Sequence, residues 1–170
     1  MPIKTAEELH HLVTDILVAA GADASNASRT ADALILSEQS GVVTHGVHHM
    51  RRYMDAINDG GIVPSAKPEI VRETPNSALA KGNWTFGFLT AKFAVDLAIE
   101  KAAKENVAVI SATQVNHIGR LGEYAERAAS SGMVSLIFAS GYGSQQPMAV
   151  PYGGRKSVLS TNPISIGVPS

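Results

Sequence analysis

Residues 107–139 read VAVISATQVNHIGRLGEYAERAASSGMVSLIFA and indicate the class of the fold. Two apolar runs rich in β-branched residues, Val107–Ser111 and Met133–Ala139, flank a segment with helical spacing, Gly119–Ser131. We expect two buried strands joined by a helix, and this local order predicts a parallel pair with a right-handed crossover. This region is therefore expected to form an α/β layer.

The N-terminal part of the chain has the periodicity of helices. Thr5 and Glu8 have the spacing of a capping box, and the apolar positions after them recur every three or four residues. A second helix is expected over Ser25–Gln39 and a third from Thr44 onward. We expect a helical bundle over residues 1–65.

A proline-containing linker, Pro64–Pro68, separates this bundle from the rest of the chain. After it, Glu69–Glu73 and Ser77–Lys81 are typical of short strands, and Thr90–Lys104 is typical of an amphipathic helix. Residues 66–170 are expected to form a second domain. The fold class is therefore α/β (α+β).

Composition excludes several classes of protein. The net charge of −1 and the lack of a basic cluster exclude a nucleic-acid partner. The chain has no cysteine, which excludes disulfides, thiolate metal sites and cysteine nucleophiles. No apolar run is long enough for a membrane span and Met1–Thr5 lacks the features of a secretory signal, so we expect a cytoplasmic protein without a membrane partner. The end at Gly167–Ser170, directly after an apolar run, suggests an interruption.

Three polar side chains are expected on one face of the third helix. His45, His49 and Arg52 follow one another at helical spacing, with Thr44 as the expected N-cap. An imidazole can transfer a proton near neutral pH, and a guanidinium can bind a carboxylate through two parallel hydrogen bonds. The pattern indicates a site for a small carboxylate-bearing molecule, although a solvated helix face explains the same residues.

A further histidine, His117, lies where the strand Val107–Ser111 passes into the next helix. Ligands collect at the carboxyl ends of strands in α/β layers, and Gly119 and Gly122 would let a ligand approach the backbone. The alternative is a histidine that only caps a helix and bonds a neighbouring carbonyl.

Metal and phosphate sites are less well supported. His45, His48 and His49 have the spacing of helical metal ligands, but no carboxylate matches them, so no metal site is expected. A metal-dependent lyase or hydrolase that uses the His45/His49 face is kept as the alternative. Gly141–Gln146 resembles the start of a dinucleotide fingerprint, but its last glycine is missing, so a Rossmann turn is not expected.

Taken in order, the motifs resemble one family. Thr44–Val47, Arg52-Tyr53, Asn116–Gly122, Pro151–Gly154 and Thr161–Pro163 are similar to the malate/L-lactate dehydrogenases of the non-Rossmann kind. His117–Ala139 most resembles the hydroxycarboxylate dehydrogenase B branch. Members of this family continue well beyond Thr161–Pro163, so the resemblance is to their N-terminal half.

The resemblance implies hydride transfer between NAD or NADP and a 2-hydroxy acid, 2-keto acid or imine analogue. It also implies a mixed sheet beside a helical bundle, not a Rossmann fold, and a homodimer or larger oligomer. It assigns acid–base chemistry to His45 or His117, with His45 preferred. The residues it places at the substrate are Thr44, His49, Arg52 and Tyr53. The residues it places at the cofactor are Gly119, Ser140, Gly141, Thr161, Asn162 and Pro163.

Two departures from the family pattern affect the substrate. His49 stands where many relatives have an arginine that clamps the substrate carboxylate, and Thr44 replaces a serine. The first change argues against a simple malate or lactate substrate, because an imidazole lacks the permanently charged guanidinium fork. The shorter length leaves a third possibility, a non-catalytic subunit that assembles with a partner. The sequence does not separate NAD from NADP.

Overall fold

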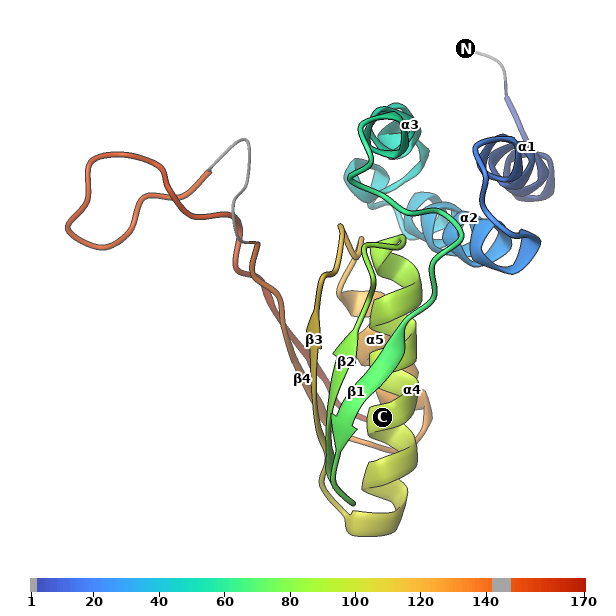
Figure 1. Ribbon diagram of the computed structural model, residues 1–170. Helices are drawn as coiled ribbons and strands as arrows, with labels where there is room; N and C mark the ends of the chain where they lie inside the picture. The colour runs from blue at the N-terminus through green and yellow to red at the C-terminus, as the bar shows by residue number, and fades with distance from the viewer. Residues whose placement is uncertain (1–2, 142–147) are drawn as a thin grey trace. The chain divides into compact units, whose positions relative to one another are not determined.

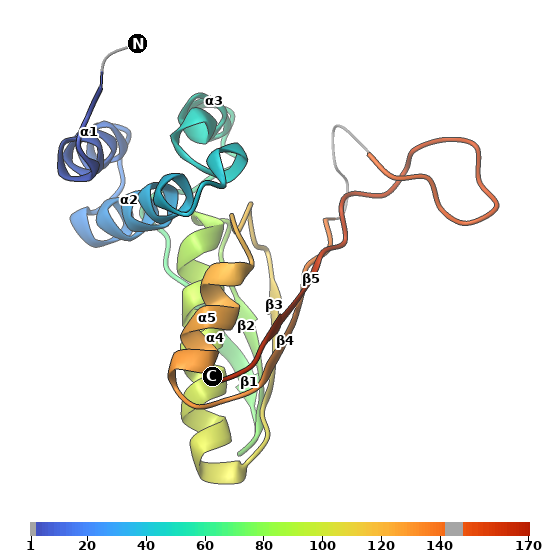
Figure 2. The ribbon, with the colours of Figure 1, turned by 180° about the vertical axis from the view of Figure 1, so that it is seen from behind.

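The computed structural model describes residues 3–141 and 148–170 (Figures 1 and 2). The contacts divide the chain into two compact units, Met1–Arg120 and Leu121–Ser170. We describe each unit by itself. The domain boundary expected at residues 65–66 is a separate matter and stays a prediction.

The first unit begins with helices. They are α1 (Ala6–Ala19), α2 (Ala24–Gln39) and α3 (Met50–Asn58), and two 3₁₀ turns, Val43–His45 and Val47–His49, connect α2 to α3. The capping box at the start of α1 is confirmed, since Glu8 N–H donates to Thr5 Oγ1 at 3.1 Å and Thr5 N–H donates to Glu8 Oε2 at 2.8 Å. One buried apolar cluster joins these helices to the start of α4 (Gly87–Glu105). Its members are Val13, Leu17, Ala22, Ala27, Ala31, Ala33, Leu34, Tyr53, Ile62, Phe86 and Phe88.

A three-stranded sheet completes the first unit. Its strands are β1 (Glu69–Glu73), β2 (Ser77–Lys81) and β3 (Val109–Thr113), with β1–β2 antiparallel and β2–β3 parallel. Helix α4 (Gly87–Glu105) connects β2 to β3 and packs on the sheet, as Figure 2 shows. The two strands expected before α4, Glu69–Glu73 and Ser77–Lys81, are confirmed with the same bounds. Short runs of this kind between turn residues are typical of strands.

The second unit is a helix on a two-stranded ribbon. Helix α5 (Gly122–Ser130) packs on β4 (Ser135–Phe138) and β5 (Ile164–Gly167), which are antiparallel. Gly167 faces the helix, since a Cβ there would lie 2.5 Å from the Ala125 carbonyl oxygen. The opposite face carries large apolar side chains, all more than 60% exposed. They are Val134, Leu136, Phe138, Ile164, Ile166 and Val168.

The fold class is confirmed as a mixed α/β fold with a small mixed sheet, but the expected parallel pair was wrong. The strands on either side of α5 lie in different sheets, and the parallel pair with a helical connection is β2–α4–β3. Local order cannot choose the partner of a strand, because pairing is made by distant segments. The expectation of two buried strands was also wrong: Val109 is 64% and Leu136 62% exposed, since each sheet has a helix of its own unit on only one face.

Within residues 3–141 and 148–170, no helix combines the length and apolar character needed to cross a bilayer.

Candidate active site

The sequence predicts a continuous helix from Thr44 onward, but the segment that carries His45 does not form one. It forms two 3₁₀ turns, and α3 begins only at Met50, so Thr44 does not cap it. Glu38 at the end of α2 causes the break: its Oε1 accepts a hydrogen bond from Val47 N–H at 2.8 Å. A Cβ on Gly46 would collide with the same carboxylate, so any other residue there would have to displace the Glu38 side chain.

The segment that carries His117 is held against the start of α4. Asn116 donates its side-chain amide hydrogens to three backbone carbonyl oxygens, those of Gly61, Trp84 and Thr85, at 2.8–3.1 Å. Gly87 lies directly beneath, where a Cβ would collide with the carbonyl oxygens of Asn116 and His117. These contacts fix the backbone on which His117 stands.

Gly119 and Phe88 fix the other side of the same loop. Gly119 has φ +70°, a region that glycine adopts without strain, and a Cβ there would collide with the Phe88 ring. Phe88 is 1% exposed, and its ring meets those of Tyr53 and His117 edge-on, at centroid distances of 6.0 and 6.2 Å. The buried phenylalanine therefore supports both side chains from below.

Three histidines and a tyrosine converge on this support. The His45 and His117 rings are stacked with centroids 5.6 Å apart, and the His49 ring lies 4.9 Å from that of His117. The Tyr53 hydroxyl and His117 Nδ1 are 2.8 Å apart. Thr44 belongs to the same group, because its hydroxyl is 3.1 Å from His45 Nδ1 and its carbonyl oxygen 2.8 Å from His49 Nε2. Residues separated by much of the first unit's sequence thus form one cluster.

The charges around the cluster favour an anion. Burial, together with the charges of His49, His45 and Arg52, lowers the pKa of His117 to about 4, so this imidazole is neutral at pH 7. Burial also lowers the pKa of His49, together with the charge of His48. Every charged neighbour that acts on His117 is a cation when protonated, so a bound carboxylate would relieve their repulsion.

The structure brings together most of the residues expected at the substrate. Thr44, His45, His49 and Tyr53 lie in the cluster with His117. Arg52 is exposed on α3, close enough for its charge to act on His49 and His117. Their roles in binding and catalysis stay predictions.

Residues expected at the cofactor divide between the two units. Gly119 lies beneath the cluster in the first unit. In the second unit, Ala139 N–H donates to the Pro163 carbonyl oxygen at 3.3 Å, and a Cβ on Gly141 would lie 2.7 Å from Ser160 Oγ. These contacts place two exposed segments, Ser140-Gly141 and Thr161–Pro163, side by side at one end of the β4–β5 ribbon. Residues 142–146 of the segment that resembles the start of a dinucleotide fingerprint lie outside the described residues.

The donor chemistry of those two segments fits a nicotinamide cofactor. The exposed hydroxyl groups of Ser140 and Thr161 and the amide of Asn162 can bond a carboxamide or ribose hydroxyls. Gly141 allows Ser160 to approach closely, since a Cβ at Gly141 would collide with the Ser160 side chain. The residues present therefore suit the group that the family resemblance implies.

Several residues of the cluster were missed from the sequence. Phe88 falls before the helical periodicity that marks α4, and Glu38 looks like an ordinary polar residue at a helix end. Asn116 was part of a quoted motif, but nothing in the sequence showed its three carbonyl partners. Gly46 and Gly87 lie next to these residues in the structure, but the sequence around neither glycine is a strong turn signal.

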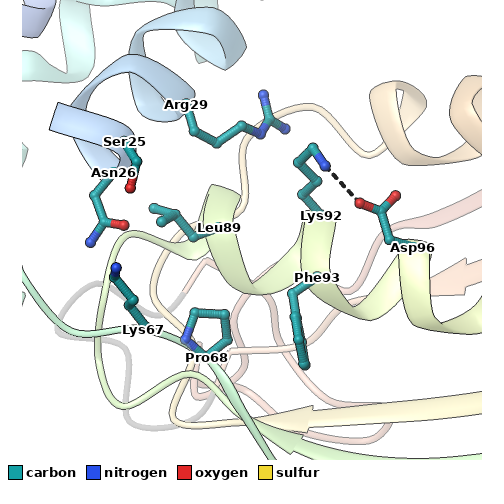
Figure 3. Close-up of a pocket in the computed structure, with 9 residues that line it drawn as sticks. All are labelled: Ser25, Asn26, Arg29, Lys67, Pro68, Leu89, Lys92, Phe93 and Asp96. Atoms are coloured by element: carbon teal, nitrogen blue, oxygen red, sulfur yellow. Dashed lines mark hydrogen bonds and ion pairs between the residues drawn. The ribbon is translucent and has the colours of Figure 1, made fainter. Parts of the chain in front are cut away.

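A pocket elsewhere in the first unit lacks comparable chemistry. It lies between α2, the linker and α4 (Figure 3). Its lysines already have anionic partners, Lys92 with Asp96 at 2.6 Å and Lys67 with Asp23 at 3.5 Å. Among the described residues, no group of three or more His, Cys, Asp or Glu could hold a metal ion.

The comparisons with known proteins identify the family of this chain. The family model described as malate/L-lactate dehydrogenase matches residues 4–170. The chain belongs to this family. It is 35% identical over 164 residues to the malate dehydrogenase of Pyrococcus abyssi, covering 96% of this chain and 44% of that protein. It is 34% identical over 170 residues to the L-sulfolactate dehydrogenase of Methanothermobacter thermautotrophicus, covering 100% and 48%.

A solved family structure has the same fold. The malate dehydrogenase of Pyrococcus horikoshii OT3 superposes with a TM-score of 0.89 at 32% identity, over 97% of this chain and 46% of that one. The resemblance stated from the sequence motifs is thereby confirmed. The chain spans about half the length of the curated relatives it matches, and the matching part contains the whole histidine cluster.

Proposed function

We propose that this protein is an NAD(P)-dependent oxidoreductase that transfers hydride between a nicotinamide cofactor and a small 2-hydroxy or 2-keto acid. The observation that carries the proposal is the cluster of His45, His49, Tyr53 and His117, which lies in a chain of the malate/L-lactate dehydrogenase family. Such a cluster combines groups that transfer protons with cations that attract a carboxylate.

The substrate carboxylate binds Arg52 and His49 in this proposal. Arg52 supplies a permanent positive charge, and His49, whose Nε2–H donates to the Thr44 carbonyl oxygen, donates from Nδ1 when the bound carboxylate favours its protonated form. Thr44 orients His45 through the hydroxyl contact at 3.1 Å. The reacting oxygen of the substrate then lies against His45 and His117, one of which transfers the proton.

The relatives suggest acids with two anionic groups. Those compared above are named malate dehydrogenase and L-sulfolactate dehydrogenase, and malate and sulfolactate each carry a second negative charge. The first unit can accept such a charge, because His48 adds another ring 4.2 Å from that of His49. We infer that a dianionic 2-keto acid is preferred over pyruvate.

Of the residues that the family resemblance places at the cofactor, the two exposed segments of the second unit, Ser140-Gly141 and Thr161–Pro163, are proposed to hold it. When bound, the nicotinamide supplies or accepts the hydride. No residue singled out here separates NAD from NADP, so both are candidates. The protein is proposed to act in the cytoplasm as a homodimer or larger oligomer, with a pocket completed by sequence equivalent to the second half of its relatives.

A substrate panel tests this proposal. Oxaloacetate, sulfopyruvate and pyruvate are each mixed with NADH or NADPH, and the loss of reduced cofactor is followed by absorbance. Both the 170-residue chain and a chain fused to the second half of the Pyrococcus abyssi relative are assayed. Turnover by the fused chain is expected, with the dianionic acids fastest.

Two substitutions serve as controls for the panel. His45→Gln is expected to reduce turnover by at least about 100-fold if it removes the proton-transfer group. His10→Gln removes a histidine of α1 whose partner is Asp32, outside the cluster, and is expected to have no effect. A folded, fused chain that oxidises neither cofactor with any of the acids contradicts the proposal.

A further inference from the structure

The Tyr53 side chain is buried, and its hydroxyl contacts His117. It is 3% exposed, lies on α3 and packs against Phe88. Its hydroxyl reaches Nδ1 of His117, a residue 64 positions away, at 2.8 Å. Among the described residues this is the one hydrogen bond of either side chain, so the pair forms an isolated buried contact.

The direction of this hydrogen bond follows from the chemistry of the two groups. Burial raises the pKa of the Tyr53 hydroxyl, which therefore keeps its hydrogen at neutral pH. Burial and the surrounding cations lower the pKa of His117 to about 4, so its imidazole carries a single N–H. A phenol whose one polar neighbour is a ring nitrogen donates to it, because the alternative leaves its hydrogen without an acceptor in a buried place.

We propose that Tyr53 is a positioning residue, which donates to Nδ1 of His117 and so holds the imidazole neutral with its hydrogen on Nε2. That N–H then donates a hydrogen bond to the oxygen of the substrate's 2-keto group and stabilises the charge that develops there. The inference rests on the proposed function for its substrate and on the Tyr53–His117 contact for its geometry.

The assignment also divides the work between the two histidines. His117 is fixed by the Asn116 anchor, the Phe88 ring and the Tyr53 hydroxyl, which belong to separate segments of the first unit. The Nδ1 of His45 contacts only the hydroxyl of its own neighbour, Thr44, among the described residues. His117 is thus suited to a fixed hydrogen-bond donor, and His45 to the group that gains and loses the proton.

The groups that could protonate His117 or compete for its hydrogen are few. The ones acting on it are His45, His48, His49 and Arg52, and none is a carboxylate. A carboxylate partner at Nδ1 would stabilise the imidazolium, whereas a phenol does not. With the Tyr53 phenol at Nδ1, no carboxylate in this place favours the imidazolium, so the ring stays neutral.

Nitrogen NMR tests the hydrogen bond without any need for activity. In the ¹⁵N-labelled chain near pH 7, long-range proton–nitrogen spectra report which ring nitrogen carries the hydrogen, and His117→Gln assigns the signals. We expect a protonated Nε2 and a bare Nδ1 whose resonance is shifted by the Tyr53 hydroxyl. A hydrogen found on Nδ1 of the wild-type protein overturns the proposal, and this measurement needs no Tyr53 variant.

Tyr53→Phe sharpens the test, because it retains the ring and removes only the hydroxyl. The Nδ1 resonance of His117 is expected to move toward that of a nitrogen without a donor, while the His10 signals stay in place. Tyr152→Phe is the matched control, since Tyr152 is fully exposed and should change neither residue. An unchanged Nδ1 resonance in folded Tyr53→Phe protein overturns the positioning role.

Kinetics of the fused chain separates this inference from the proposed function. Tyr53→Phe is expected to lower kcat on the order of tenfold with KM nearly unchanged, since the lost effect concerns the charge that develops in the transition state. A change in KM alone overturns the role at the keto oxygen. If the NMR result is as expected but the fused chain has no dehydrogenase activity, the Tyr53–His117 hydrogen bond stands. The catalytic role of this pair is then overturned together with the proposed function.

Discussion

In the first unit Leu17, Leu34 and Phe88 are at most 1% exposed, whereas in the second unit Leu136, Phe138 and Ile166 are 62–66% exposed. The sequences around them are similarly apolar. The difference comes from the layers: α1, α2, α3 and α4 enclose one cluster, while the β4–β5 ribbon has the α5 helix on one face only. An apolar run becomes a core only where a second layer covers it.

The histidine cluster lies on the well-packed side of this comparison. Phe88 and Tyr53 belong to the buried cluster of the first unit and also support His117. The core that stabilises the helices therefore also determines the geometry of the site. Substitutions of apolar residues in the two units should therefore change the free energy of unfolding by very different amounts.

Phe88→Ala is expected to give the largest loss. Removing this buried ring should lower the free energy of unfolding by about 3–5 kcal/mol, through lost burial and the cavity it leaves. The measurement is urea unfolding followed by circular dichroism. Phe138→Ala is the matched control, since Phe138 is 66% exposed and should cost less than about 0.5 kcal/mol. Equal costs would mean that the two units are packed alike.

Gly119→Ala is expected to cost about 2–4 kcal/mol, because it combines a strained φ of +70° with a collision between the new methyl group and the Phe88 ring. Gly132→Ala in the second unit has a similar φ of +75° but nothing near its Cβ position. It should cost only about 1 kcal/mol, from strain alone. Urea midpoints of the two variants, measured in parallel, give the contribution of the collision by difference.

The pH dependence of stability tests the burial of His117. Its pKa is lowered from 6.5 to about 4, so the unfolded chain binds this proton more readily than the folded one. The stability it contributes is complete above pH 6.5 and is lost as the pH falls toward 4, by an amount on the order of 3 kcal/mol. The decrease should be smaller in His117→Gln. Identical pH profiles of the two proteins would show that His117 titrates as it does in the unfolded chain.

Leu136→Ser should have the smallest effect on stability. The side chain is 62% exposed on the open face of β4, so the free energy of unfolding should change by less than about 0.5 kcal/mol. Binding of a hydrophobic dye should decrease, because the substitution interrupts the apolar face. A loss of several kcal/mol would instead reveal that this face is covered in solution.

Local elements of the fold could be predicted where short-range chemistry decides them. The capping box at Thr5 and Glu8 and the strands Glu69–Glu73 and Ser77–Lys81 needed only neighbouring residues. The predicted start of the third helix was wrong. Glu38, which lies outside the helical pattern, accepts a hydrogen bond from Val47 N–H, and two 3₁₀ turns precede α3. Periodicity alone contains no information about such a contact.

The sequence determined the family, the helical start of the chain and the set of residues that carry its chemistry, because motifs and periodicity are properties of neighbouring positions. The tertiary structure decided which strands pair, which apolar runs are buried and how His45, His49, Tyr53 and His117 meet. Those outcomes depend on contacts between distant segments. A hydroxyl from α3 on a histidine beyond β3 is an arrangement that only packing creates.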